Sequence, residues 1–468
     1  MRIAHAVCVL LGHLLVAAGM LGPVASAVAD SLAGFRAGPW FGEQVRERWL
    51  DRNVRVIVNA PEHIDPKRPT RLVIYATPNA NTIEQTLGCA KAEGLDWHFD
   101  IQHVAAQVRR LREVSPGENI VLACIEAEGL SWPTWRRNVA DSSSRIRAIV
   151  EGLRDLVPGT PVRVTLTGHS GGGSFVFGFL NSADAIPDYV ERIAFLDSNY
   201  AYSDAEKHGD KMFAWLKADA GRRLSVIAYD DREIMLDGKR VVSKDGGTYR
   251  ATQRMIDRFA KDVELTERKH GDFVTRTGLD GRVSIYVHTN PKNRILHTAL
   301  VGEMNGLMRV LTDGNPKAPD WGSFGGPRAY ARWIEPAPGI PPRPTDAIGG
   351  SAFVKQIATL KPAEREEAIA NEALRGNIPD FLRKFQTITV TIKDKSGRER
   401  TAKYEVMPDY LAIGSDVDFV RMPMTPMTAQ RIADAFGCAV PTRKVVDDVF
   451  RNASVKLKPS PLTEARES

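Results

Sequence analysis

Short apolar stretches rich in β-branched residues recur through the first two thirds of the chain, and each of them ends in turn-forming residues. Seven have the length and composition of buried strands. They are residues Val54–Val58, Arg71–Ala76, Asn119–Cys124, Val162–Thr167, Arg192–Leu196, Leu224–Tyr229 and Val283–His288. Several are apolar almost throughout, which is typical of strands buried on both faces of a parallel sheet.

Helical periodicity separates these stretches. Val104, Val108 and Leu111 recur at the spacing of one helical face within residues 103–114, and residues 143–156 repeat the pattern. Strands that alternate with helices predict an α/β domain, in which helices flank a mostly parallel sheet. We expect this domain to span residues 30–312.

The composition changes after that domain. Eight prolines and seven glycines fall within residues 313–350, which predicts a linker. Beyond it, residues 351–468 form the pattern of a small α+β unit of unknown role. Helices are predicted at residues 362–374, 428–436 and 443–450, and strands at 386–393 and 399–407.

The N-terminal 29 residues have the pattern of a signal peptide. Arg2 precedes an apolar stretch that runs to Leu21, Pro23 interrupts it, and Ala25-Ser26-Ala27 supplies small residues for cleavage. The alternative is an uncleaved membrane anchor, because about 20 apolar residues can span a bilayer. With cleavage, we expect a soluble protein that is secreted or periplasmic and has no membrane contact.

Charge and cysteine content narrow the classes of function. The formal net charge is only +6 in 468 residues, without a long basic run, so nucleic-acid binding is not expected. No Cys-x-x-Cys pair is present, and no metal or cofactor site is predicted. Cys89 and Cys124 either form a disulfide in an oxidising compartment or remain buried thiols like Cys438, and their spacing does not decide between these.

The most specific motif is Gly-His-Ser-Gly-Gly at residues 168–172, which follows a predicted strand and precedes a helix-like stretch, residues 174–180. It has the G-x-S-x-G pattern of a nucleophile elbow, a sharp strand-to-helix turn whose serine has a strained backbone. Gly168 and Gly172 avoid the steric clashes of such a tight turn. The motif predicts that Ser170 is a nucleophile, rather than an ordinary turn serine.

With this motif and the alternation of strands and helices, residues 50–312 resemble the α/β-hydrolase family. The resemblance implies that nucleophile, acid and histidine follow one another in this order along the chain. It also implies that the acid and the histidine lie in loops after later strands of the same sheet.

The acid is expected at the end of the strand Leu224–Tyr229, where Asp230 and Asp231 follow directly. A carboxylate there would hold the histidine in the correct tautomer and stabilise the imidazolium. Glu233 and Asp197 are alternatives, since Asp197 follows the preceding strand. Solvated loop charges are the ordinary interpretation of the Asp230-Asp231 pair.

The histidine is expected at His297, which follows the last predicted strand and a turn at residues 290–293 and precedes a helical apolar face. It would accept the proton of Ser170 and return it to the leaving group. The competing histidines are His288, at the end of that strand, and His270, in a polar segment before it.

Two backbone N–H groups are expected to stabilise a tetrahedral oxyanion. Gly171, next to the nucleophile, supplies one. The second is expected from the loop after residues 71–76, which reads Thr-Pro-Asn-Ala and departs from the His-Gly pattern of lipases. Pro78 has no N–H, so the donor is predicted to be Asn79, with Ala80 as the alternative.

Three aromatic residues are candidates for substrate binding. His169 adjoins the nucleophile, and Trp132 and Trp135 follow the predicted strand 119–124. Two exposed indoles there would offer a stacking surface for a sugar or an aromatic ester, whereas buried indoles would only pack the loop.

Together these features predict a serine hydrolase that cleaves carboxylic esters through an acyl-enzyme, without a cofactor, on a small or polymeric ester substrate. A serine peptidase or amidase with the same triad is one alternative, because the same residues cleave both bonds. The other is an inactive hydrolase scaffold that binds a cell-wall polymer or a protein.

Overall fold

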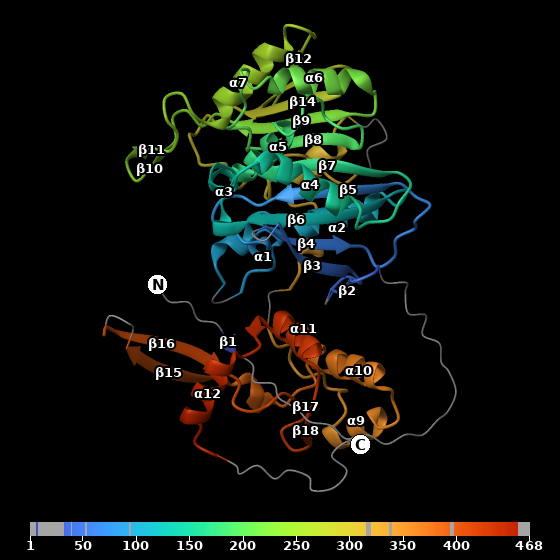
Figure 1. Cartoon of the computed structure of the whole chain (residues 1–468), viewed down its shortest axis with the longest axis vertical. Helices are drawn as coiled ribbons and strands as arrows, with labels where there is room; N and C mark the ends of the chain where they lie inside the picture. The colour runs from blue at the N-terminus through green and yellow to red at the C-terminus, as the bar shows by residue number, and fades with distance from the viewer. Residues whose placement is uncertain are drawn as a thin grey trace. The chain divides into compact units, whose positions relative to one another are not determined.

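The computed structural model describes residues 6–7, 32–38, 40–51, 54–92, 95–314, 320–336, 339–393 and 397–456. The predicted signal peptide therefore lies outside the described residues, except for the two-residue strand β1 (Ala6–Val7). Two compact units divide at Ala337 and Pro338 (Figure 1). Among the described residues, no helix combines the length and apolarity needed to cross a bilayer.

The larger unit is built on one sheet of eleven described strands in the order β12-β13-β14-β9-β8-β7-β5-β6-β4-β3-β2. The central strands from β6 to β14 are parallel to their neighbours, and antiparallel strands extend both edges. All seven predicted strands are present. The strands are β2 (Arg36–Ala37), β3 (Gln44–Leu50), β4 (Val54–Ala60), β5 (Thr70–Ala76), β6 (Asn119–Ala127), β7 (Val162–His169), β8 (Val190–Leu196), β9 (Arg223–Tyr229), β12 (Thr266–His270), β13 (Phe273–Gly278) and β14 (Val283–His288).

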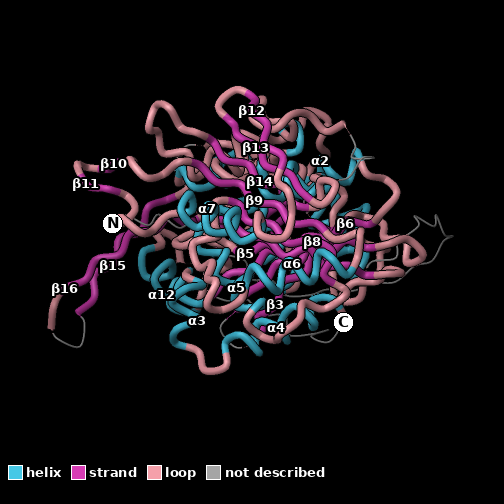
Figure 2. The backbone as a smooth tube through the Cα atoms, turned by 90° about the horizontal axis from the view of Figure 1, so that it is seen from above, coloured by secondary structure: helices cyan, strands magenta, loops and turns pink. Residues whose placement is uncertain are grey.

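Helices cover both faces of this sheet (Figure 2). One apolar core packs one face against α3 (Trp132–Asn138), α4 (Ser142–Arg154), α5 (Gly173–Leu180), α6 (His208–Ala218) and α7 (Thr248–Phe259). A second core packs the other face against α1 (Ile83–Leu87), α2 (Val104–Val114) and α8 (Gly306–Thr312). The predicted α/β fold with a mostly parallel sheet is confirmed.

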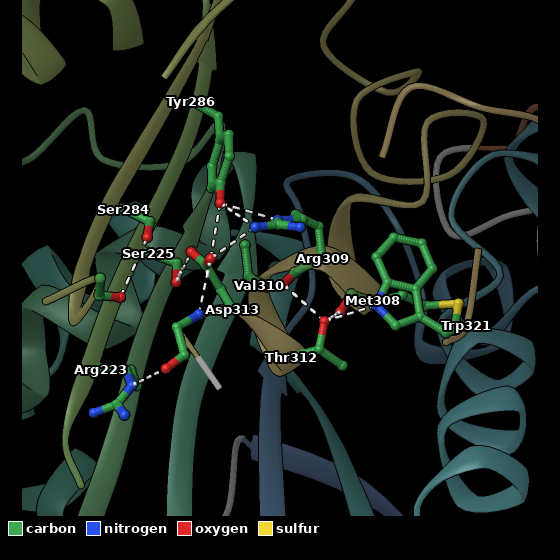
Figure 3. Close-up of polar contacts among 12 residues, drawn as sticks. Arg223, Ser225, Ser284, Tyr286, Met308, Arg309, Val310, Thr312, Asp313 and Trp321 are labelled. Atoms are coloured by element: carbon green, nitrogen blue, oxygen red, sulfur yellow. Dashed lines mark hydrogen bonds and ion pairs between the residues drawn. The ribbon is translucent and has the colours of Figure 1, made fainter. Parts of the chain in front are cut away.

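A buried polar cluster attaches α8 to the sheet (Figure 3). Asp313, which follows the helix, accepts hydrogen bonds from Tyr286 of β14 at 2.8 Å and from Ser225 of β9 at 3.0 Å. Arg309 donates to the same carboxylate at 3.0 Å and to the Tyr286 hydroxyl. These bonds fix the start of the segment after α8 against two neighbouring strands.

Within the predicted linker, residues 313–350, the first half includes residues that pack against the larger unit. Trp321 and Tyr330 are buried in the second core of the larger unit, and Trp321 donates to the Thr312 hydroxyl at 2.8 Å. Arg328 pairs with Asp100 at 2.7 Å. The larger unit therefore continues to Ala337. Proline and glycine content indicated irregular backbone, but not whether that backbone packs.

The smaller unit has a core of its own, with a hairpin of β15 (Gln386–Lys393) and β16 (Glu399–Val406) and a pair of short strands, β17 (Ala412–Gly414) and β18 (Phe419–Arg421). Strand β1 pairs in parallel with β16 and with β19 (Cys438–Ala439). Its helices are α9 (Gly350–Ile357), α10 (Pro362–Leu374), α11 (Pro426–Phe436) and α12 (Arg443–Asn452). The predicted helices and hairpin are present within two residues of their expected bounds.

Cys89 and Cys124 are buried free thiols. The thiol interpretation is therefore the one that the structure shows. Burial raises the pKa of the Cys89 thiol to about 11, so this thiol is a weak nucleophile at neutral pH.

We expect residues 32–337 to fold as an independent domain and residues 32–312 to be much less stable. The shorter chain lacks Trp321 and Tyr330, and removing a large buried aromatic side chain costs about 3–5 kcal/mol. Thermal and urea unfolding, followed by circular dichroism, would measure the difference. Equal stability of the two chains would contradict the placement of the unit boundary at Ala337.

Candidate functional site

The predicted elbow is present where β7 ends. Ser170 has φ +53°, in the left-handed region that is strained for a non-glycine residue, and it opens a 3₁₀ turn (Ser170–Gly172) that leads into α5. A Cβ atom on Gly172 would lie 2.2 Å from the Ala76 carbonyl oxygen of β5, and one on Gly168 2.9 Å from it. Both glycines are therefore required by the close approach of the turn to the neighbouring strand.

His297 makes a short polar contact with a buried carboxylate. Its Nδ1 lies 2.5 Å from Oδ2 of Asp197, a residue that follows β8 and is fully buried. Asp197 has φ +46°, so its backbone is strained as well, and its N–H donates to Ile227 O at 2.8 Å. An Nδ1–H that donates to the carboxylate leaves the His297 Nε2 lone pair free to accept a proton.

The carboxylate in contact with His297 is thus that of Asp197, which the sequence offered only as an alternative to the expected Asp230 or Asp231. The Asp230 carboxylate turns to Arg232, which binds it through Nε at 2.8 Å and Nη2 at 2.7 Å. The Asp231 carboxylate accepts the Thr248 N–H at 2.8 Å, at the start of α7. Neither forms a hydrogen bond to His297.

Sheet order explains why three segments far apart in the sequence reach the same edge of the sheet. Ser170, Asp197 and the His297 loop follow β7, β8 and β14, and these strands are parallel through β9. The carboxyl ends of parallel strands meet at one edge of the sheet, where ligands bind in open α/β folds. Asp231 follows β9 and belongs to the same edge, next to the strand that carries Asp197.

His169 links the elbow to the His297 loop. Its Nε2 lies 3.0 Å from the His297 carbonyl oxygen, and the two ring centroids are 4.3 Å apart. Burial, together with the neighbouring His297, holds the pKa of His169 well below its usual range, so its ring is neutral. A buried ring that supports the His297 backbone differs from the substrate-binding role expected for His169.

The rival histidines are held elsewhere. The His288 Nδ1 accepts the Asn290 N–H at 2.9 Å, and its ring packs edge-on against Phe273. His270 is exposed at the end of the edge strand β12. Neither contacts Asp197 in the described part of the chain.

The side chain of Asn79, in the loop after β5, lies against Gly171 of the elbow. The Asn79 side chain lies against Gly171 so closely that a Cβ atom on Gly171 would be 2.0 Å from Oδ1 of Asn79. The Ala80 N–H donates to Leu130 O at 2.9 Å, which leaves Asn79 as the candidate of this loop. Asn79 is exposed, as a residue at the mouth of a site must be.

The aromatic platform predicted at Trp132 and Trp135 is wrong. Both indoles are buried in the core between α3 and α5, where Trp132 packs edge-on against Phe175 at 4.8 Å between ring centroids. The segment forms a helix whose inward face carries the two indoles at i and i+3, a spacing that could have indicated burial.

The sequence analysis did not predict two residues of this site, Tyr200 and Thr248. The Tyr200 ring is edge-on to His297 at 6.4 Å between centroids and is 42% exposed, which makes it a candidate for substrate contact. The Thr248 hydroxyl donates to Asp197 Oδ1. Tyr200 lies three residues after the strand-end Asp197, so a closer reading of that loop could have found it, whereas nothing in the sequence marks Thr248.

Comparison with known proteins gives only weak structural similarity. No family model and no curated protein matches the chain. Solved structures with similar folds include an esterase from an Arctic intertidal metagenomic library (11% identity, 46% of this chain, 78% of that chain, TM-score 0.26). Another is a siderophore hydrolase from Aspergillus nidulans (12% identity, 63% of this chain, 99% of that chain, TM-score 0.31). A third is an S-formylglutathione hydrolase from Agrobacterium tumefaciens (12% identity, 56% of this chain, 91% of that chain, TM-score 0.30).

These neighbours are esterases and hydrolases, but their identities and TM-scores are too low to carry an argument about activity. The fold follows from the chain itself. A parallel core sheet with antiparallel extensions, helices on both faces, and a strained serine between β7 and α5 define the α/β-hydrolase fold.

We expect Gly172→Ala to destabilise the protein by several kcal/mol, because its methyl group would overlap the Ala76 carbonyl oxygen. The matched control is Gly152→Ala on α4, where a Cβ atom meets nothing within 4 Å and alanine should stabilise the helix by about 1 kcal/mol. Urea unfolding of both variants would measure this. If both variants changed the free energy of unfolding in the same direction, the proposed packing of the elbow would be contradicted.

Proposed function

We propose that this protein is a serine hydrolase that cleaves carboxylic esters through an acyl-enzyme, with Ser170 as nucleophile, His297 as general base and Asp197 as the acid of the triad. The observation that carries the proposal is the 2.5 Å contact between His297 Nδ1 and the buried Asp197, on a loop whose backbone is bound by His169, the residue before the strained elbow serine. A buried, unpaired carboxylate would be costly, and the imidazole compensates its charge.

The tautomer defined by this contact supports general-base catalysis. With Nδ1–H donated to Asp197, Nε2 accepts the Ser170 proton as Oγ attacks the ester carbonyl carbon. The imidazolium then returns that proton to the alkoxy oxygen, the carbon–oxygen bond breaks and the alcohol leaves. Water, activated by the same Nε2, hydrolyses the acyl-enzyme and regenerates Ser170.

The negative charge of each tetrahedral intermediate would fall near Gly171 and Asn79. Backbone N–H donors aimed at a developing oxyanion contribute about 3 kcal/mol each to transition-state stabilisation. The contact between the Asn79 side chain and Gly171 supports the pairing of these two loops. The N-terminus of α5 faces the same region and favours negative charge. We further propose that residues 1–29 direct export, so that the enzyme acts outside the cytoplasm.

Labelling with a fluorophosphonate probe tests the nucleophile. We expect Ser170 to be modified, and we expect Ser170→Ala to abolish labelling without unfolding the protein. Ser174→Ala is the control, because Ser174 lies one turn further along α5 and its side chain accepts a hydrogen bond from Arg136. Peptide mapping by mass spectrometry would identify the labelled serine.

Absence of labelling in the folded wild-type protein would refute the proposal and favour the inactive scaffold. If Ser170 is labelled, p-nitrophenyl esters tested beside matched anilides would separate an esterase from an amidase. Faster turnover of the anilides would assign the peptidase or amidase alternative.

The acid is tested by a pair of conservative variants. We expect Asp197→Asn to lower kcat/KM for a p-nitrophenyl ester by roughly 10³- to 10⁴-fold, because the amide favours the wrong imidazole tautomer. Asp230→Asn should leave kcat/KM nearly unchanged, since that carboxylate binds Arg232 instead. If Asp230→Asn lowered kcat/KM strongly and Asp197→Asn did not, the triad acid would be Asp230, at the end of β9.

A further inference from the structure

A second buried carboxylate lies beside the proposed triad acid. Asp197 Oδ1 accepts the Thr248 hydroxyl, while Asp231 Oδ2 accepts the Thr248 N–H at 2.8 Å and lies 3.5 Å from the same hydroxyl oxygen. Asp231 is only 3% exposed, and its Oδ1 is buried without a hydrogen-bond partner among the described residues. The Thr248 hydroxyl thus lies between the carboxylates of Asp197 and Asp231.

We propose that Asp231 and Thr248 are positioning residues of this site: Thr248 orients Asp197 toward His297, and the charge of Asp231 sets the pH range in which His297 acts as a base. This inference rests on the proposed function. It assigns to Asp231 an electrostatic role in place of the direct contact expected from the sequence.

The local backbone is shaped around this arrangement. Gly247 precedes α7 with φ +91°, and a Cβ atom there would lie 2.4 Å from Asp231 Oδ2. Asp231 can therefore reach the first turn of α7, where N–H groups lack partners within the helix. In this way Asp231 holds the helix start, and the helix start presents the Thr248 hydroxyl to Asp197.

The Thr248 hydroxyl has a single proton and donates it to Asp197. Asp231 then retains only backbone donors, and no lysine or arginine pairs with it in the described part of the chain. The titratable groups that face it are Asp197 from the β8 loop, Tyr200, and Tyr229 of β9, with His297 beyond Asp197. The surroundings therefore oppose a negative charge on Asp231.

Burial and the neighbouring Asp197 charge raise the pKa of Asp231 to about 6. Below this pH, Asp231 is neutral, and of the two carboxylates Asp197 alone carries a negative charge. Above it, Asp231 carries a second negative charge beside that of Asp197, whose carboxylate contacts the imidazole.

The pH dependence of fluorophosphonate labelling tests this role. Removal of the Asp231 charge should make the imidazolium less stable, so Asp231→Asn should move the acid limb of the labelling rate to lower pH, by about 0.5 to 1 unit. Asp230→Asn is the matched control, because its neighbour Arg232 already compensates that charge, and its limb should coincide with the wild type.

A limb of Asp231→Asn that coincides with the wild type would overturn the inference while leaving the proposed function intact. Absence of labelling in the wild type at every pH would instead refute the proposed function. A merely structural role of Asp231 would lower the rate at all pH values without displacing the limb.

The hydroxyl of Thr248 is tested by isosteric replacement. Thr248→Val should lower kcat for a p-nitrophenyl ester by roughly 10- to 100-fold with little change in KM, because a hydrogen bond to a charged group is lost. Thr248→Ser should restore most of kcat. Equal activity of the valine variant and the wild type would remove Thr248 from the site.

Stability gives a readout that needs no catalysis. The pKa of an unfolded aspartate is about 3.9, so the folded state binds the Asp231 proton more strongly. This contribution to stability is full below about pH 4 and is lost as the pH rises through about 6. The Tm of Asp231→Asn minus the Tm of the wild type should therefore rise by roughly a few degrees between pH 4 and pH 8. A constant difference in Tm would show that Asp231 is not held protonated.

Discussion

The hydrogen bond between His297 and the buried Asp197 is the interaction on which the site depends. It joins a loop after β14 to the end of β8, across β9, and so requires that these strands run parallel and end together. The carboxylate is fully buried, and its charge is compensated by the imidazole and by the Thr248 hydroxyl. Loss of either partner would leave a charge in an apolar interior.

The segment that carries His297 is restrained at both ends. Upstream, Asn290 binds the Asp230 carbonyl oxygen at 3.0 Å and the Arg294 carbonyl oxygen at 2.9 Å. Downstream, α8 is tied to β9 and β14 by Asp313 and Arg309. His169 supports the middle through the His297 carbonyl oxygen. A general base on a loop needs such restraint, because its geometry must be held within a fraction of an ångström.

Two strained residues of this site lie directly at strand ends. Ser170 and Asp197 both have positive φ values, and Asp197 is bound on one side by Ile227 of β9 and on the other by Thr248 of α7. Such conformations persist only where surrounding contacts outweigh their cost, which is about 1–3 kcal/mol each. The elbow glycines meet this condition for Ser170 by allowing the turn to touch β5.

The sequence by itself determined the seven central strands, the elbow at Ser170, His297, and the helices and hairpin of the C-terminal unit. These are local properties, because apolar runs, glycine spacing and helical periodicity act within a few residues. Only the tertiary structure decided that Asp197 rather than Asp231 reaches His297, since both follow strands of the same edge and differ in strand order, not in pattern. The packing of residues 320–336 also depended on contacts between distant segments, which no local pattern specifies.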